Sequence, residues 1–279
     1  IANTSDFDKT KDAVAYEDLK GSDKYLLVRL NQVIQSVREA YDRYNFMEVY
    51  RTIFNFLTND MSAFYLDFAK DIVYIETANS TDRRRMQTVM YEILVKLTKL
   101  LVPIVPHTSE EIWTYLEQEE EAYAYLTEMP SADVIPDAAE ILDFWSAFLE
   151  FRTGVHKALE MARDEKVIGK SLEASVMVYP DEAVKVLLAS VAETEDVATL
   201  LIVSELIVSD QAAPEDAVKV GDTAITVNHA VGGVCQRCRR IDESVGTNAN
   251  AHLVELCEHC ASIVTLEFPE AAAEGFESK

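Results

Sequence analysis

Four cysteines near the carboxyl end constrain this 279-residue chain more than any other feature of its sequence. They form two pairs, Cys235-Gln-Arg-Cys238 and Cys257-Glu-His-Cys260, with eighteen residues between the pairs. Two thiolates spaced in this way can bind one ion from a tight turn, and two such turns supply the four sulfurs of a tetrahedral zinc site. Because the chain has no other cysteine, we predict one structural zinc ion bound by Cys235, Cys238, Cys257 and Cys260.

Two other interpretations of these cysteines stay open at this stage. Two disulfide bonds would suit a secreted protein, but no signal peptide opens the chain, and cysteines spaced for metal suit a reducing, cytoplasmic location. Alternatively, His252 or His259 replaces one of the cysteines as a ligand. Four thiolates complete a closed site, so we expect the metal to stabilise the fold of a short segment and not to catalyse a reaction.

The net charge of −24 is distributed unevenly along the chain. Residues 1–101 contain 14 Lys and Arg against 15 Asp and Glu, whereas residues 102–231 contain 7 against 26. The acidic middle argues against nucleic acid as its partner, while the balanced first part can present a local basic face. No apolar run is long enough to span a bilayer, so we expect no membrane partner. We also expect no DNA partner, and we expect a monomer.

Helical periodicity dominates the first 163 residues. Apolar side chains recur every three or four positions from about Asp23 to Tyr44, from Phe46 onwards, from Asp82 to Leu101, and from Ala138 to Arg163. A break near residues 58–59 is either the start of a separate helix or a kink within a longer one. Helices of this length with short links favour an antiparallel bundle.

The pattern changes after residue 170. Residues 172–179, 200–208 and 223–231 read as strands, and residues 183–191 as a short helix. We therefore predict a mainly α fold, in which an antiparallel helical bundle precedes a small α/β unit and a C-terminal zinc ribbon. The predicted domains are a bundle (1–136), a long helix with an α/β junction (137–231) and a four-cysteine zinc-binding module (232–279).

Seven arginines are candidates for RNA contact. Arg83, Arg84 and Arg85 open a predicted helix, where positive charge opposes the helix dipole, and this local cost suggests that they pair with phosphates. The alternative is solvated charge, or ion pairs with acids across the bundle. Arg38 can add to the same basic face. The remaining three flank the first cysteine pair, where RNA contact and plain surface charge are equally compatible with the sequence: Arg237, Arg239 and Arg240.

Aromatic residues are dense between positions 41 and 68, and unpaired bases could stack on them. Packing in the core of the bundle is the better interpretation for most of them.

Catalytic constellations are missing from the sequence. The cysteines are assigned to the metal, His107 has no evident Ser or Cys partner, and none of the eight glycines forms a phosphate-binding loop. We predict no catalytic residue in this chain. The residues by themselves support a binding module, and the alternative function is a zinc-stabilised helical scaffold for protein–protein interaction.

Several stretches together resemble the bacterial isoleucyl-tRNA synthetases. Residues 59–67 and 83–113 are similar to the anticodon-binding bundle of that family, residues 162–174 to its junction, and the cysteine pairs to its zinc-binding end. The opening Ala-Asn-Thr-Ser-Asp-Phe-Asp at residues 2–8 looks like the stretch after the catalytic core. We therefore expect a C-terminal fragment of a longer protein. The four-cysteine module disfavours the sibling enzymes for valine, leucine and methionine.

The resemblance implies that the chain docks the anticodon stem-loop of isoleucine tRNA on its bundle, helped by the zinc module. The family implies a cytoplasmic isoleucine–tRNA ligase with an editing domain. ATP and Mg²⁺ would act only in that parent enzyme, because its two ATP-handling signatures are absent here. Many relatives have Trp after the second cysteine, where this chain has Arg239, which puts RNA contact by the module in question.

Overall fold

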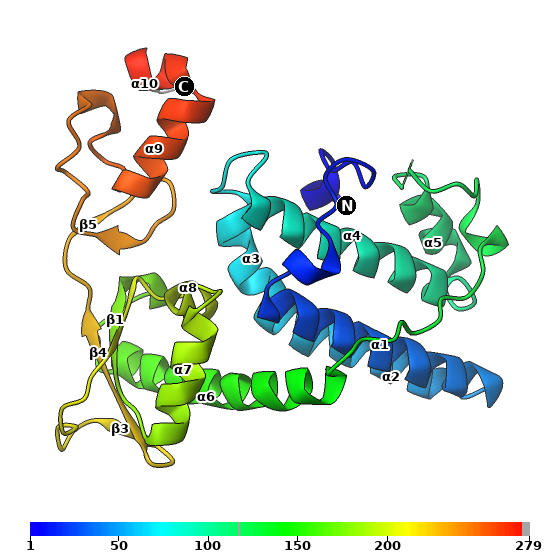
Figure 1. The fold of residues 1–279 in the computed structure, drawn as a ribbon, viewed down its shortest axis with the longest axis horizontal. Helices are drawn as coiled ribbons and strands as arrows, with labels where there is room; N and C mark the ends of the chain where they lie inside the picture. Colours follow the sequence, from blue (N-terminus) through cyan, green and yellow to red (C-terminus); the bar gives the residue numbers. More distant parts are fainter. Residues whose placement is uncertain (117, 275–279) are drawn as a thin grey trace. The chain divides into compact units, whose positions relative to one another are not determined.

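The computed structural model describes residues 1–116 and 118–274, and it divides the chain into two compact units (Figure 1). The first unit comprises Ile1–Val73 and Ala78–Asp143, and the second comprises Tyr74–Thr77 and Phe144–Lys279. The fold is mainly helical, with a small sheet and a C-terminal cysteine cluster, which confirms the predicted fold class. The predicted three-part division at residues 136 and 231 stays a prediction. Within the described ranges, no helix is long and apolar enough to cross a membrane.

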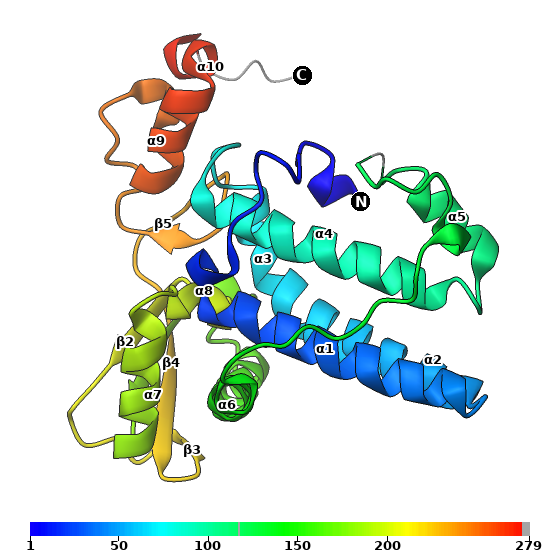
Figure 2. The ribbon, with the colours of Figure 1, turned by 45° about the vertical axis from the view of Figure 1, so that its right-hand side comes forward.

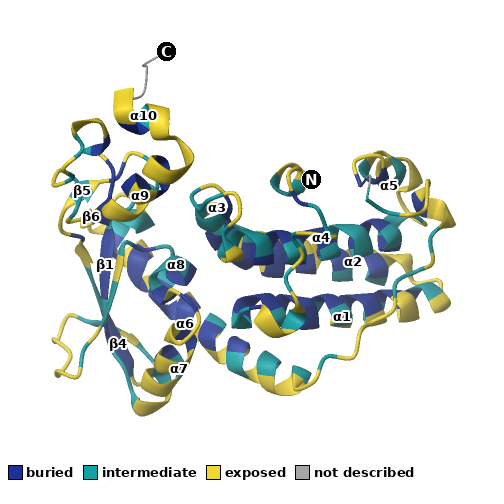
Figure 3. Cartoon of the chain, turned by 45° about the horizontal axis from the view of Figure 1, so that its top comes forward, coloured by how far each residue is buried: buried dark blue, intermediate teal, exposed yellow. Residues whose placement is uncertain are grey.

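The first unit is a helical bundle. Its helices are α1 (Gly21–Asp42), α2 (Phe46–Asn55), the π-helical segment η3 (Phe56–Tyr65), α3 (Leu66–Val73), α4 (Thr81–Leu101) and α5 (Pro106–Trp113), with short 3₁₀ turns at Ala2–Thr4, Tyr16–Asp18 and Ala124–Leu126. Helix α1 packs against both α2 and α4 (Figure 2). In Figure 3, buried positions recur along both α1 and α4. The side chains at helical spacing that make this core include Leu26, Leu30, Ile34 and Val37 of α1, and Met86, Val89, Ile93 and Leu97 of α4.

The helix that starts at Phe46 continues without interruption to Val73, so the break expected near residues 58–59 is a π segment inside one longer helix. A π-helix is rare and inserts extra residues into the helical turn. Asp60 in this segment accepts a hydrogen bond from Nε of Arg29 at 3.0 Å. At the end of the segment, the Tyr65 hydroxyl donates to the carboxylate of Asp23 at 2.6 Å. The π segment therefore faces α1 with polar as well as apolar side chains.

The second unit contains a four-stranded sheet and the cysteine module. Its elements are α6 (Ala138–Asp164, of which the first six residues fall in the other unit), β1 (Ala174–Tyr179), α7 (Glu182–Ala192), α8 (Val197–Leu201), β2 (Glu205–Val208), β3 (Val218–Val220), β4 (Thr223–His229), β5 (Gly233–Val234), β6 (Ile241–Asp242), α9 (Glu258–Glu267) and α10 (Pro269–Glu274), with 3₁₀ turns at Ser171–Glu173 and Ala251–Leu253.

The strand order in the sheet is β2-β1-β4-β3. Strand β1 is parallel to β2 and antiparallel to β4, and Val176 at its centre is opposite both Leu206 and Val227. A parallel pair requires a crossover connection, which α7 and α8 provide. Helix α6 approaches β3 at Gly154, where an added Cβ would lie 2.3 Å from Val220. Glycine at this position therefore permits the close packing of helix and sheet.

The prediction of a strand over residues 200–208 is wrong in its first part. Val197–Leu201 forms helix α8, which ends where Ile202 adopts a left-handed conformation (φ 58°), and the strand begins only at Glu205. Asp196 caps α8 by accepting a hydrogen bond from the amide of Ala198 at 3.1 Å. Short apolar runs do not distinguish a buried helix from a strand, and here the capping aspartate decides.

Candidate metal centre and nucleic-acid interface

The first cysteine pair lies in the turn between β5 and β6. Within this turn the Cys235 carbonyl accepts a hydrogen bond from the amide of Arg239 at 2.9 Å, and the Cys235 amide donates to the Arg240 carbonyl at 2.8 Å. Arg239 has a left-handed backbone (φ 67°), which lets the chain turn back directly after Cys238. The turn thus directs two sulfurs to the same side.

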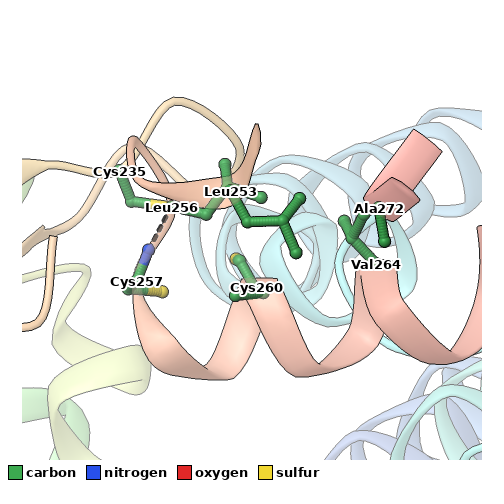
Figure 4. Close-up of a cluster of buried hydrophobic side chains, with 8 residues drawn as sticks. Cys235, Leu253, Leu256, Cys257, Cys260, Val264 and Ala272 are labelled. Carbon is green, nitrogen blue, oxygen red and sulfur yellow. Dashed lines mark hydrogen bonds between the residues drawn. The ribbon is translucent and has the colours of Figure 1, made fainter. Parts of the chain in front are cut away.

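The second cysteine pair lies at the start of helix α9. Cys257 is the N-cap residue and Cys260 lies in the first turn. The amide of Cys257 donates to Sγ of Cys235 at 3.3 Å, a bond that joins the two pairs directly (Figure 4). The positive end of a helix dipole favours ionised thiolates, so this position suits sulfur ligands.

The four sulfurs converge on one point. All four Sγ atoms lie within 4.8 Å of one another, and those of Cys238 and Cys257 are 3.9 Å apart. A disulfide requires about 2.05 Å between sulfurs, and all four cysteines are free thiols, so the disulfide interpretation is wrong. A tetrahedral ion with sulfur at about 2.3 Å would place its ligands roughly 3.8 Å apart. The spacing therefore fits a tetrahedral metal site.

Neither histidine belongs to this cluster. Within residues 1–116 and 118–274, the four cysteines alone form a group of possible metal ligands. Nε2 of His259 instead contacts a carboxylate oxygen of Glu76 at 3.0 Å, and His252 is exposed. The alternative in which a histidine replaces a cysteine is therefore not adopted.

The cysteine cluster is buried and its sulfurs interact strongly. Cys235, Cys257 and Cys260 are buried, and they pack with Leu253, Leu256, Val264 and Ala272 (Figure 4). Hydrogen bonds from Cys238, Cys257 and Cys260 lower the pKa of the Cys235 thiol, whereas contacts with Cys235, Cys238 and Cys257 raise the pKa of Cys260. Four thiolates this close repel one another unless a cation compensates their charge, which is what a divalent metal supplies.

Arg237, between the first two cysteines, is occupied by contacts within the second unit. Its Nη2 donates to the carbonyl oxygen of Ile75 at 2.6 Å, and its Nη1 lies 3.8 Å from Sγ of Cys260. Ile75 itself packs against the buried cysteine cluster. The guanidinium therefore fastens residues 74–77 to the cysteine module.

Replacing Arg237 with alanine is expected to release residues 74–77, because the hydrogen bond to Ile75 and the contact with Cys260 are lost together. Hydrogen bonds to charged groups contribute about 1.5–3 kcal/mol, so hydrogen exchange of this segment should accelerate roughly 10- to 150-fold. Exchange measured by mass spectrometry checks this. Arg239→Ala is the matched control, because that arginine lies in the same turn and its side chain bonds only to Gln236 among the described residues. If residues 74–77 exchange at the same rate in both variants and in the unsubstituted chain, the prediction is wrong.

The other two arginines of the module differ in their exposure and in the residues that they contact. Arg239 is exposed, and its Nη1 donates to the side chain of Gln236 at 2.7 Å. Arg240 is half-buried and pairs with the carboxylate of Asp196 at 3.3 Å and with the hydroxyl of Thr199. Of the three arginines around the first pair, Arg239 has the most accessible guanidinium.

The arginines that open α4 form ion pairs inside the first unit. Arg83 binds both carboxylate oxygens of Asp6, at 2.5 and 2.9 Å, and its hydrogen bond lowers the pKa of Asp6 to about 2. Arg84 also contacts Asp6, at 3.3 Å. Arg85 is buried, with Nη1 2.7 Å from Asp23. This is the ion-pair alternative that the sequence left open, and an RNA-binding role for these three residues stays a prediction.

Arg38 lies on the exposed side of α1. Its Nη1 donates to the carbonyl oxygens of Met129 and Pro130 at 2.9 and 3.0 Å. It shares no contact with Arg83, Arg84 or Arg85 among the described hydrogen bonds and ion pairs, so the structure does not bring these four residues together as one basic cluster.

The family described as "Anticodon-binding domain of tRNA ligase" matches residues 23–178, which is more than half of the chain.

The chain belongs to this anticodon-binding family.

Its matched range contains most of the bundle, α6 and most of β1. The chain is similar to the isoleucine–tRNA ligase of Lactococcus lactis subsp. lactis, with 58% identity over 99% of this chain. It is 56% identical to that of Streptococcus sanguinis and 55% identical to that of Streptococcus gordonii, in each case over 100% of this chain. The resemblance to isoleucyl-tRNA synthetases is thereby confirmed. The chain spans 30% of the length of each of these relatives.

Several aromatic residues of this anticodon-binding domain are exposed, although packing in the core was the prediction for most of them. Phe56, Phe64, Tyr65 and Phe68 are buried in the bundle, as expected for core residues. Others are largely exposed: Tyr44, Phe46, Tyr50 and Phe54. Phe46, Tyr50 and Phe54 recur every four residues along α2, offset from the buried Val49 and Ile53, and this spacing is the signal that could have placed them on one face.

Proposed function

We propose that this chain is the tRNA-recognition portion of a longer isoleucine–tRNA ligase and that it docks the anticodon stem-loop of isoleucine tRNA. The observation that carries the proposal is the anticodon-binding family match over residues 23–178, supported by identity to isoleucine–tRNA ligases along the whole chain. These comparisons favour tRNA recognition over the scaffold alternative. Activation of isoleucine with ATP and Mg²⁺, its transfer and its editing would belong to the remainder of the parent enzyme. The protein would act as a cytoplasmic monomer.

The four cysteines would hold one structural Zn²⁺. Zinc suits them because it accepts four thiolates in a tetrahedral arrangement, and the sulfur spacing of 3.9 Å between Cys238 and Cys257 agrees with that geometry. The ion would supply charge compensation and a cross-link between the β5–β6 turn and α9. No open ligand position is needed for this role.

Two exposed arginines are the most accessible of the seven RNA-contact candidates. Arg239 and Arg38 lie on the surface, and their present acceptors are neutral oxygens that a phosphate can replace. The other candidates are less accessible: Arg237 is half-buried and contacts Sγ of Cys260, and Arg83, Arg84, Arg85 and Arg240 would first have to give up a carboxylate. We therefore assign phosphate contact first to Arg239 and Arg38.

Binding of the purified chain to isoleucine tRNA, and to the same tRNA with an altered anticodon, tests the proposal. The native anticodon should bind more tightly, and log Kd should rise linearly with log salt concentration because phosphate contacts release counterions. Arg239→Ala should weaken both complexes about equally and reduce the salt slope by about one.

Equal affinity for the two tRNAs at every salt concentration would show that the chain makes only generic electrostatic contact. Absence of binding at low salt would remove the recognition role from this chain and favour a protein-binding scaffold.

A further inference from the structure

Helix α2 and the first turn of η3 carry a stripe of large apolar side chains that stay partly exposed. Phe46, Tyr50, Phe54 and Leu57 recur at steps of four and three, so they share one face of the helix, and Met47 borders it. Their exposed fractions are 50% for Phe46, 57% for Tyr50 and 51% for Phe54. Exposed apolar residues gathered on one helix face indicate a binding surface.

The rings of this stripe are arranged for stacking. Tyr50 and Phe54 lie with their centroids 5.6 Å apart and their planes inclined by only 26°. Phe46 meets Tyr41 edge to face at 6.1 Å, which steadies the first ring of the stripe. Rings that are half-exposed and nearly parallel offer flat faces, and unpaired bases of any sequence can stack on such faces.

The charge of this face suits a polyanion. The chain carries 49 acidic residues, yet the only acid in α2 is Glu48, which lies two positions from Phe46 and therefore on the opposite side of the helix. Glu48 is also paired with Arg43 at 3.1 Å. Arg51 follows Tyr50 directly, is exposed, and has no hydrogen-bond or ion-pair partner among the described residues.

We infer that the α2 stripe, Phe46, Tyr50, Phe54 and Leu57 with the flanking Arg51, is a stacking surface for unpaired nucleotides of the bound tRNA. This rests on the proposed function and adds to it the class of contact, since Tyr50 and Phe54 stack on bases while Arg51 pairs with a phosphate. A protein partner would use the same apolar area, but it gives no role to the exposed and unpaired Arg51 beside the stripe. The chemistry therefore favours single-stranded nucleic acid.

The test uses the whole chain and a synthetic anticodon stem-loop that carries 2-aminopurine at an unpaired loop position. Stacking of the fluorescent base on a ring should quench it on binding, and Tyr50→Ala and Phe54→Ala should remove most of the quench. Each substitution should raise Kd by about 5- to 150-fold, because the loss of one base–aromatic stacking contact weakens binding by a factor of that size. The salt slope should not change in these variants. Arg51→Ala should reduce it by about one.

Tyr115→Ala is the matched control, because Tyr115 is another exposed tyrosine of the same unit outside the stripe. Circular dichroism of each variant checks that α2 stays helical. If the parent chain binds the stem-loop and both ring variants bind it with the same Kd and the same quench, the inference is wrong and the proposed function stands. If the ring variants instead change only self-association in sedimentation experiments, the stripe is a protein contact. If the parent chain fails to bind tRNA, the proposed function fails first and the inference with it.

Discussion

Replacement of Cys260 by serine is expected to unfold residues 232–274 while the helices of the first unit stay folded. This module has a small core, and three of the eight residues in its buried cluster are cysteines, so little apolar area stabilises it without a cross-link. Structural zinc in small domains binds with about 10–16 kcal/mol, and most of that free energy is folding free energy. Loss of one ligand, or removal of the metal by a chelator, should therefore leave the module without a stable fold.

Metal analysis and limited proteolysis check this prediction. The chain without substitutions should contain one zinc ion. The Cys260→Ser variant and the chelated chain should be cleaved rapidly after residue 232. His259→Gln and His252→Gln are the controls, because both histidines lie outside the sulfur cluster, and both variants should keep the ion. A chelated chain whose last fifty residues resist protease would show that the fold of the module does not depend on the metal.

Replacement of Arg85 by methionine is expected to destabilise the first unit by about 3–5 kcal/mol, which is the cost of leaving one partner of a buried ion pair uncompensated. The side chains of Arg85 and Asp23 are 1% and 0% exposed, and they lie 2.7 Å apart. Asp23 also accepts hydrogen bonds from the Tyr65 hydroxyl at 2.6 Å and from the Lys20 amide at 3.1 Å. Methionine fills a similar volume but supplies no charge to Asp23.

Urea unfolding followed by circular dichroism measures this loss of stability. Arg43→Met is the control, because the Arg43–Glu48 pair is largely exposed and such pairs contribute about 0–1 kcal/mol. The double variant Asp23→Leu/Arg85→Met should be more stable than Arg85→Met alone, because no buried charge is left unpaired. A loss below about 1 kcal/mol in Arg85→Met would mean that water reaches Asp23. The same stability loss would also explain any weakening of tRNA binding by this substitution.

Features that depend on residues close together in the chain could be predicted from the sequence. The cysteine ligands are identifiable because each pair closes its own turn, and the structure brings the same four sulfurs within 4.8 Å of one another. The predicted bundle helices and long α6 agree with the structure to within a few residues, because an apolar stripe repeated over five or more turns has one interpretation. Family motifs then connected the chain to tRNA ligases, which the comparisons confirmed.

Only the tertiary structure decided what the arginines and aromatics contact. Arg83 and Arg85 meet carboxylates 77 and 62 residues away in the chain, and local sequence cannot distinguish such a partner from a phosphate. Tyr50 and Phe56 are both large aromatic residues and lie close together in the sequence. One is exposed and the other buried, because the turn of a continuous helix past α1 sets which face reaches the core. The hydrophobic effect favours burial of an aromatic ring wherever other residues can cover it, and the tertiary structure determines which rings have such neighbours.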